Sequence, residues 1–359
     1  MNTEKLIKET LRLAKKGLGR VNPNPMVGAV IVKNGKIISK GYHKFFGGDH
    51  AEVDAIKRAE NKVKGSTLYV NLEPCCFYGK TPPCTELIVR SGINKVFIGD
   101  IDPNPSVKGK GIDFLRKHGV EVINGVLQDE CRKLNKVFYK YMSTGIPFIS
   151  VKIAQTVDAK ISEEKGKETS ITSIASKRVV HKLRSMHDAV LIGKNTAIVD
   201  DPSLTVRFCN GRSPRRILLD ENLKINSGLK LLNKPLAEDT IVFTTKDCDN
   251  SVKKKLEEKN VQVVIVKKNK DGLVNLKNVL KKAAKLGISS VMVEGGADVF
   301  SAFISQKLAD KIYIFIAPKI FMQGIDSFGK ILGINKKNKL MFETVKQIEE
   351  DILIEAVIL

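Results

Sequence analysis

Two periodicities of apolar side chains run through the first 125 residues. Between residues 3 and 16 the apolar side chains recur at positions 6, 7, 11 and 14, which predicts an amphipathic helix with Thr3 as its N-cap. Two apolar runs, 26–32 and 37–42, flank the dipeptide Asn34-Gly35. Both residues of that dipeptide accept a positive φ angle, so this stretch predicts a β-hairpin with a tight turn.

The pattern continues as an alternation of helices and strands. The further elements that we expect are a helix over 50–61 capped by Asp49, a strand over 67–72, a helix over 85–91, a strand over 95–99, a helix over 109–118 and a strand over 120–124. This order indicates a sheet with helices packed on its faces.

The alternation is interrupted at 143–147, where the sequence Ser-Thr-Gly-Ile-Pro predicts a linker between two domains, 1–145 and 146–359. The second half then starts a new alternation, which predicts another α/β sheet domain. Its expected strands are 148–153, 188–193, 216–220, 240–244, 261–266, 290–294 and 311–317, and its expected helices lie near 173–186, 274–286 and 298–307.

Length and composition agree with two folded domains. The chain has 359 residues, and domains typically have roughly 100–200. Its 42% hydrophobic and 28% charged residues are ordinary for a globular protein and argue against disorder. The longest apolar runs are seven residues, far below the roughly 20 that a membrane span needs, and the charged N-terminus does not resemble a secretory signal. We therefore expect a cytoplasmic protein without membrane contact.

The net charge of +22 raises the possibility of nucleic-acid binding. However, residues 1–145 hold 25 basic and 14 acidic residues, and residues 146–359 hold 36 and 25, so the excess is equal in both halves. Only 12 of the 61 basic residues are arginine, and the chain has no tryptophan for base stacking. The charge therefore predicts solvated lysine-rich surfaces, and we expect no nucleic-acid partner.

A metal-binding pattern lies in the first half. His50 and Glu52 fall in the first turn of the expected helix 50–61, and Cys75 and Cys84 flank the start of the next helix. One imidazole and two thiolates form a three-ligand zinc set that leaves the fourth position open, as a catalytic site requires. The helix N-terminus favours the thiolate forms. Glu52 can reach a zinc-activated water without binding the metal, and can carry its proton to a leaving amine.

This pattern resembles the cytidine-deaminase-like superfamily, whose signature is H-x-E followed by P-C-x-x-C. Here eight residues separate Cys75 from Cys84. That longer insert is similar to the pyrimidine deaminase of riboflavin biosynthesis. The same resemblance is carried by the segments Asn22–Gly28, Gly47–Glu52, Asp102–Pro105 and Gly109–Gly111.

The resemblance and the residues leave some roles open. Cys76 is either an alternate ligand or a bystander, and we interpret it as a bystander. The resemblance places Asn24 in contact with substrate, although a loop-capping role also explains it. We interpret His43 and His118 as surface or core histidines.

The second half resembles the reductase of the same pathway, which has a dihydrofolate-reductase-like fold. The segments that carry the likeness are 151–160, 188–207 and 293–296. Gly295-Gly296 follows an expected strand and opens an expected helix, where backbone N–H groups can meet a pyrophosphate, although no G-x-G-x-x-G motif is present. Arg184 and Arg207 suit bidentate phosphate contact.

The resemblance also implies individual roles. Cofactor contacts fall on Ala154, Ser170, Thr196, Asp200 and Gly296, and substrate contacts fall on Asn24, Glu168, Arg184, Leu204, Arg207 and Glu294. One departure is that Ser170 stands where the family has an aromatic residue that covers the cofactor.

The whole chain thus resembles the bifunctional deaminase–reductase family of riboflavin biosynthesis. The resemblance implies an α/β protein with an N-terminal cytidine-deaminase-like three-layer α/β/α domain and a C-terminal dihydrofolate-reductase-like α/β domain. It implies zinc-dependent deamination of 2,5-diamino-6-(5-phosphoribosylamino)pyrimidin-4(3H)-one and NADPH-dependent reduction of the ribosyl chain of the product to ribityl. It also implies Zn²⁺ and NADPH as cofactors, a phosphorylated pyrimidine as substrate and a homo-oligomer.

Two other hypotheses remain at this point. The first is a single-activity deaminase with a decayed reductase half. The second is a nucleic-acid base deaminase, which would bind RNA with a steep salt dependence.

Overall fold

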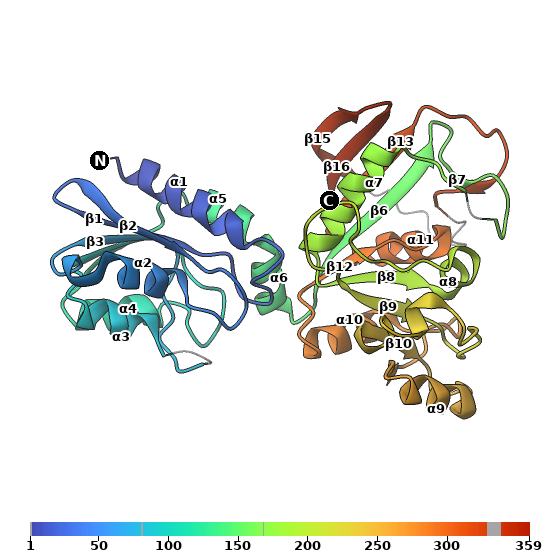
Figure 1. The fold of residues 1–359 in the computed structure, drawn as a ribbon, viewed down its shortest axis with the longest axis horizontal. Coiled ribbons are helices and arrows are strands. Elements are labelled where there is room, and N and C mark those ends of the chain that lie inside the picture. Colours follow the sequence, from blue (N-terminus) through green and yellow to red (C-terminus); the bar gives the residue numbers. More distant parts are fainter. Residues whose placement is uncertain (1, 80–81, 168, 329–338) are drawn as a thin grey trace. The chain divides into compact units, whose positions relative to one another are not determined.

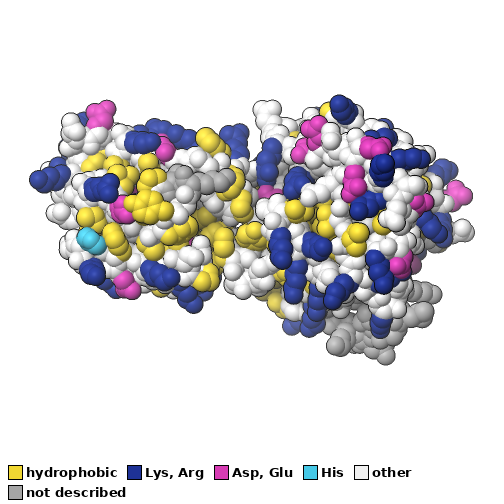
Figure 2. Space-filling model, turned by 90° about the horizontal axis from the view of Figure 1, so that it is seen from below, with side chains coloured by type: hydrophobic (Ala, Val, Ile, Leu, Met, Phe, Trp, Pro, Cys, Tyr) yellow, Lys and Arg dark blue, Asp and Glu magenta, His cyan; other side chains and the backbone are white. Residues whose placement is uncertain are grey.

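The computed structural model describes residues 2–79, 82–167, 169–328 and 339–359 (Figure 1). The chain forms two compact units, Met1–Gly145 and Ile146–Leu359. None of the helices in the described residues has both the length and the apolarity that a membrane crossing needs. On the face shown in Figure 2, lysine and arginine side chains are scattered over both units, with acidic side chains among them.

The N-terminal unit is built on a five-stranded sheet with the order β2-β1-β3-β4-β5. β1 pairs antiparallel with β2 and with β3, whereas β3, β4 and β5 are parallel and are joined by helical crossovers. The strands are β1 (Gly28–Lys33), β2 (Lys36–Tyr42), β3 (Thr67–Leu72), β4 (Lys95–Asp100) and β5 (Glu121–Asn124). The helices are α1 (Thr3–Ala14), α2 (Ala51–Ala59), α3 (Cys84–Arg90), α4 (Lys110–Lys117), α5 (Gln128–Leu134) and α6 (Lys136–Thr144).

Helices cover both faces of this sheet. On one face, apolar side chains of α2, α3 and α4 pack against the strands, and on the other face α1 and Cys131 of α5 do so. The side chains of β3 and β4 point alternately into the two cores, because successive strand residues face opposite sides. The three-layer α/β/α arrangement and the predicted order of elements are confirmed (Figure 1).

Two helix starts differ from the prediction. The N-cap of α1 is Asn2 and not Thr3, because the Asn2 side chain accepts hydrogen bonds from the backbone N–H groups of Glu4 and Lys5. The N-cap of α2 is His50 and not Asp49.

The Asp49 carboxylate pairs instead with Lys57 Nζ at 2.7 Å.

The predicted turn at Asn34-Gly35 is confirmed, with φ angles of 50° and 71°.

The C-terminal unit contains a nine-stranded sheet with the order β11-β10-β9-β8-β12-β6-β13-β16-β15. The pairs from β11 to β13 are parallel, and the last three strands are antiparallel. The main strands are β6 (Phe148–Thr156), β8 (Ala189–Gly193), β9 (Arg215–Leu219), β10 (Thr240–Thr244), β11 (Gln262–Ile265), β12 (Ser290–Val293), β13 (Lys311–Ala317), β15 (Leu340–Ile348) and β16 (Asp351–Ile358). A separate ribbon joins β7 (Lys160–Ser162) to β14 (Ile325–Asp326).

Helices again lie on both faces of the larger sheet. The helices are α7 (Ile174–Met186), α8 (Lys194–Asp200), α9 (Asn250–Glu258), α10 (Leu276–Lys285) and α11 (Ala297–Ser305). Apolar residues of α7, α8 and α9 belong to one core, and those of α10 and α11 belong to the other. All seven predicted strands are present, and the dihydrofolate-reductase-like α/β fold is confirmed.

In the N-terminal unit the sequence patterns missed α5 and α6, and in the C-terminal unit they missed α8, α9, the small ribbon and the C-terminal hairpin of β15 and β16. β15 was missed because its side chains are mostly exposed and it mixes apolar and charged residues without a clean alternation. These four helices are only seven or nine residues long, which is too short for a helical period to stand out.

A buried carboxylate joins two loops of the N-terminal unit. Glu73, just after β3, accepts hydrogen bonds from four backbone N–H groups at 2.9–3.2 Å. The donors are Asp102, Gly109, Gly111 and Ile112. Because these amides include the start of α4, Glu73 fixes that helix and the loop before it. A side chain at Gly111 would meet the carbonyl oxygen of Pro74 at 2.3 Å, so only glycine allows this approach.

We therefore expect Glu73→Gln to lower the free energy of unfolding of the N-terminal unit by about 2–4 kcal/mol. The amide replaces one acceptor oxygen with a donor, which leaves buried N–H groups without a partner. Denaturant unfolding of the full chain measures this change. Glu130→Gln is the control because Glu130 is exposed. A Glu73→Gln variant as stable as the control would contradict this role.

Candidate active sites

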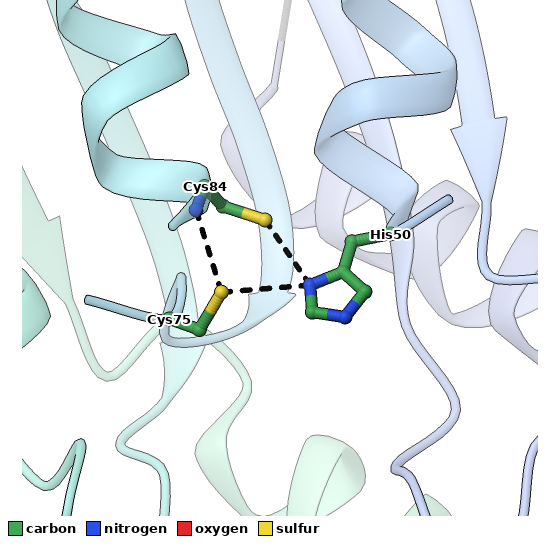
Figure 3. A group of neighbouring side chains, drawn as sticks. All are labelled: His50, Cys75 and Cys84. Atoms are coloured by element: carbon green, nitrogen blue, oxygen red, sulfur yellow. Dashed lines mark hydrogen bonds between the residues drawn. The ribbon is translucent and has the colours of Figure 1, made fainter. Parts of the chain in front are cut away.

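Three potential metal ligands converge in the N-terminal unit (Figure 3). His50 is the N-cap of α2, Cys84 is the first residue of α3, and Cys75 lies in the loop after β3. His50 Nδ1 lies 3.2 Å from Cys84 Sγ and 3.5 Å from Cys75 Sγ. All three ligand atoms lie within 4.8 Å of one another, so the two helix starts and one loop form a single site.

The donor set fits zinc. With Zn–S and Zn–N bonds of about 2.3 and 2.0–2.1 Å, the ligand atoms of a tetrahedral site lie roughly 3.5–3.8 Å apart. The two nitrogen–sulfur distances above come close to that spacing without rearrangement of the backbone. Three protein ligands leave one tetrahedral position for a water or substrate, which is the arrangement of catalytic zinc sites.

Hydrogen bonds prepare the sulfur of Cys75 for a metal. The Cys84 thiol and then His50 stabilise the thiolate and lower the pKa of Cys75 to about 4, although burial opposes the shift. The backbone N–H of Cys84 also donates to Cys75 Sγ at 3.3 Å, at the start of α3. The hydrogen bond to Cys75 and burial raise the pKa of Cys84. A bound metal deprotonates coordinating thiols, so both sulfurs can serve as thiolate ligands.

Glu52 lies beside these three residues, in the first turn of α2. Its side chain is buried, and burial raises the pKa of its carboxyl group. Glu52, His50 and Cys75 line the same cavity, which has a volume of about 250 Å³. A buried carboxyl with a raised pKa next to a metal site is suited to accept and return a proton near neutral pH.

The cavity also brings in polar residues from other loops. Asn24 Nδ2 lies 3.2 Å from His43 Nε2, and His43 Nδ1 lies 2.9 Å from the carbonyl oxygen of Asp49. Both Asn24 and His43 line the cavity. His43 is therefore a pocket residue, which the sequence interpretation as a surface or core histidine missed.

Asp102 and Asn104 also line the cavity. Burial raises the pKa of Asp102 to about 7, although its Oδ1 accepts a hydrogen bond from the backbone N–H of Asn104. Both residues belong to the Asp-Pro-Asn-Pro segment that the Glu73 carboxylate holds through the Asp102 amide. The sequence marked this segment as similar to the family but did not place it in the pocket.

Cys76 and His118 lie outside the metal group. The Cys76 thiol points to the carbonyl oxygen of Ser106 at 3.9 Å, and burial raises its pKa. His118 is exposed at the end of α4, where its Nδ1 contacts the carbonyl oxygen of Phe114. The role of Cys76 as a bystander stays a prediction.

In the C-terminal unit, buried charges gather at the end of β12. Arg184 of α7 makes a bidentate ion pair with Glu294, at 2.7 and 2.9 Å, and also donates to the carbonyl oxygen of Thr205. Lys152 Nζ lies 4.0 Å from the same carboxylate. Burial alone would raise the pKa of Glu294, but Arg184 and then Lys152 bring it below its ordinary value.

Arg184 is thus engaged with protein groups, and its contact with a substrate phosphate stays a prediction. Burial lowers the pKa of Lys152, and Glu294 opposes that shift. The sequence did not single out Lys152, because one lysine among 49 carries no signal until the fold places it beside a buried carboxylate.

Two of the predicted cofactor residues meet between α8 and α11. Gly296 is the N-cap of α11, and a Cβ atom there would lie 3.6 Å from Thr196 Oγ1. Gly295 beside it packs so closely on Val299 that a Cβ atom would meet the Val299 side chain at 2.8 Å. The turn therefore places glycine backbone next to a hydroxyl at a helix N-terminus, which fits a dinucleotide phosphate.

The remaining predicted residues of this half are placed individually. Ala154 of β6 is half-buried, and Asp200 ends α8. Ser170 is exposed, and its Oγ accepts a hydrogen bond from Lys177 Nζ at 2.9 Å. Leu204 is buried, Arg207 is exposed, and Glu168 lies outside the described residues.

Known proteins resemble the chain over both units. Residues 1–100 match the cytidine and deoxycytidylate deaminase zinc-binding region, and residues 147–354 match the RibD C-terminal domain. The riboflavin biosynthesis protein RibD of Aquifex aeolicus is 46% identical over 97% of this chain and 96% of its own. The RibD protein of Escherichia coli K12 is 32% identical over 99% of this chain and 100% of its own.

Solved structures agree along the whole length. Acinetobacter baumannii RibD superposes with a TM-score of 0.91 at 32% identity and covers 99% of both chains. The Thermotoga maritima diaminohydroxyphosphoribosylaminopyrimidine deaminase/5-amino-6-(5-phosphoribosylamino)uracil reductase gives a TM-score of 0.85 at 38% identity, also over 99% of both chains. The chain therefore belongs to the RibD family, as a bifunctional enzyme of riboflavin biosynthesis with a zinc-dependent deaminase domain and an NADPH-dependent reductase domain.

Proposed function

We propose that residues 1–145 deaminate 2,5-diamino-6-(5-phosphoribosylamino)pyrimidin-4(3H)-one and that residues 146–359 reduce the ribosyl chain of the deaminated product to ribityl. The observation that carries the first step is the convergence of His50, Cys75 and Cys84 next to a cavity that His50, Glu52 and Cys75 line. The substrates are those named for the Thermotoga maritima relative. A cytoplasmic location also belongs to this proposal.

In the deaminase, His50, Cys75 and Cys84 would hold zinc through one nitrogen and two sulfur atoms. Zinc in such a site makes water a strong nucleophile at neutral pH. The Glu52 carboxylate takes the proton of the attacking water and returns it to the leaving amino group, so ammonia departs. Its burial and raised pKa support this role, because the group must hold a proton transiently near neutral pH.

Asn24 binds the substrate beside the metal ligands. Its amide is oriented by His43, whose ring is held in turn by the Asp49 carbonyl oxygen. Because Asp49 directly precedes the ligand His50, the same short segment orients a metal ligand and a substrate-binding amide. Asn24 lines the cavity, which supports substrate contact over the alternative of loop capping.

We expect Glu52→Gln to reduce ammonia release by about 10²–10⁴-fold, the usual contribution of a positioned acid–base group. The amide retains the shape of the side chain but cannot accept the proton. Ammonia release with the diaminopyrimidine substrate and NADPH oxidation with the deaminated product are measured on the same protein. NADPH oxidation should be unchanged, and ammonia release above a tenth of the wild-type rate would refute the role of Glu52.

We expect Cys75→Ser to lose zinc and deaminase activity together, because a serine hydroxyl is a poor zinc ligand. Cys76→Ser is the matched control and should retain zinc at wild-type stoichiometry. Metal content by mass spectrometry and ammonia release distinguish the two variants. If Cys76→Ser also lost zinc, Cys76 would be a ligand and the proposed set would be incorrect.

In the reductase, NADPH supplies the hydride. Thr196, Asp200 and Gly296 would bind the cofactor, and the backbone at the start of α11 would receive its phosphates. Ala154 and Ser170 contribute further cofactor contacts. The substrate is held by Leu204, Arg207, Glu294, Glu168 and Arg184. The buried ion pair with Arg184 keeps the Glu294 carboxylate in one orientation.

The homo-oligomer is supported by an apolar sheet face at the C-terminal hairpin. β15 is the edge of the nine-stranded sheet, and Phe342 and Val345 on it are 62% and 59% exposed. Val345 aligns with Ile354 of β16, which aligns with Ile314 of β13, so an apolar row crosses three strands. An exposed edge with apolar side chains pairs readily with a copy of itself.

We expect Phe342→Lys to shift the protein from oligomer to a smaller species, because a charge would replace the apolar surface at the interface. Light scattering after size-exclusion chromatography measures the mass. Met341→Lys is the control, since the neighbouring strand residue points to the opposite face of the sheet. A Phe342→Lys protein with the wild-type oligomeric mass would exclude this face as the interface.

A further inference from the structure

The reductase unit contains a long loop that its neighbours hold firmly in place. Residues 201–214, between α8 and β9, form neither helix nor strand. Loops of this length inside compact domains are usually functional. Leu204 in this loop is buried and has a φ angle of 52°, a left-handed conformation that an ordinary side chain adopts only when its surroundings impose it. The surroundings of the loop therefore determine its shape.

Two side chains on one face of α7 hold the loop by its backbone. Arg184 Nη1 donates to the carbonyl oxygen of Thr205 at 3.1 Å. One turn earlier, His181 Nδ1 accepts a hydrogen bond from the backbone N–H of Arg207 at 2.8 Å. Residues three apart on a helix face the same side, so α7 contacts the loop at two points two residues apart.

The surroundings of His181 keep its Nδ1 able to accept the hydrogen bond from the Arg207 backbone N–H. The ring is buried, and its centroid lies 4.6 Å from that of Phe208. Burial, followed by the charges of Arg184 and Arg207, lowers the pKa of His181 to about 4, although Glu294 opposes the shift. The neutral ring therefore presents Nδ1 as an acceptor throughout the physiological pH range, with its proton on Nε2.

We propose that His181 is a positioning residue for the reductase, which fixes the backbone of Arg207 so that the guanidinium of Arg207 meets the phosphate of the substrate. This inference rests on the proposed function, in which Arg207 binds the substrate. The Arg207 side chain is exposed, so its reach is determined mainly by the position of its own backbone. That position depends on the hydrogen bond to His181.

His181 does not touch the reacting atoms in this proposal, so its loss weakens substrate binding without slowing the chemistry. A histidine with a purely structural role would have different requirements. A packing role would require only a ring of similar size beside Phe208, whereas the positioning role requires an acceptor at the place of Nδ1. The two roles therefore predict different behaviour for two substitutions.

The experiment compares His181→Phe with His181→Asn in the full-length protein. Phenylalanine retains the ring without the acceptor, and the Asn side-chain oxygen occupies the same position along the side chain as Nδ1. We expect His181→Phe to raise KM for the deaminated, phosphorylated pyrimidine about tenfold, with kcat and KM for NADPH within twofold of wild type. His181→Asn should restore KM to within threefold. Lys182→Ala, at the exposed next position, should behave like wild type.

A double-mutant cycle with Arg207→Ala completes the test. If His181 acts through Arg207, His181→Phe raises KM no further in the Arg207→Ala background. The proposal is overturned if His181→Phe leaves KM unchanged, if His181→Asn is as impaired as His181→Phe, or if the effect persists in full without Arg207. The KM of His181→Phe for NADPH shows whether this variant is folded. If that KM shows that it is not, His181→Leu takes its place, because leucine also lacks the acceptor. A wild-type protein that does not oxidise NADPH with this substrate would instead refute the proposed function.

Discussion

Buried carboxylates at the ends of sheet strands organise both active sites. Taking an ionised group out of water costs several kcal/mol unless nearby donors replace its solvation. Glu73 after β3 meets this requirement with four backbone amides, and Glu294 after β12 meets it with the bidentate Arg184 guanidinium. In each case the donors come from segments more than 25 residues away in the sequence. Satisfying one charge therefore assembles the loops that form the site.

The deaminase site illustrates how this constraint leads to chemistry. The Pro74-Cys75 segment continues directly from Glu73, so the anchor of the Asp102 loop and a metal ligand are almost adjacent. The segment that follows β3 therefore contains a potential metal ligand and also binds both the Asp102 loop and the start of α4. Helices cover both faces of the sheet, and the potential ligand atoms at its edge lie close to the spacing that zinc requires.

The reductase site uses the same principle with a different set of donors. α7 contributes Arg184 to the buried carboxylate and, through Arg184 and His181, holds a long loop. The net charge of +22 plays a smaller part. Its equal distribution between the two halves favours anionic substrates in general.

The amino-acid sequence by itself determined the two α/β domains, most of their strands and the three potential metal ligands, because these depend on local periodicity and on residue types with few alternative uses. Sequence spacing alone did not reveal Glu73, His43, Asp102, Lys152 or His181. The role of each arises only from what the fold places beside it. The exposed β15 strand was missed for a related reason, since only sheet pairing defines it. Tertiary structure decided these features, because desolvation and hydrogen bonding act between residues that are distant in the chain.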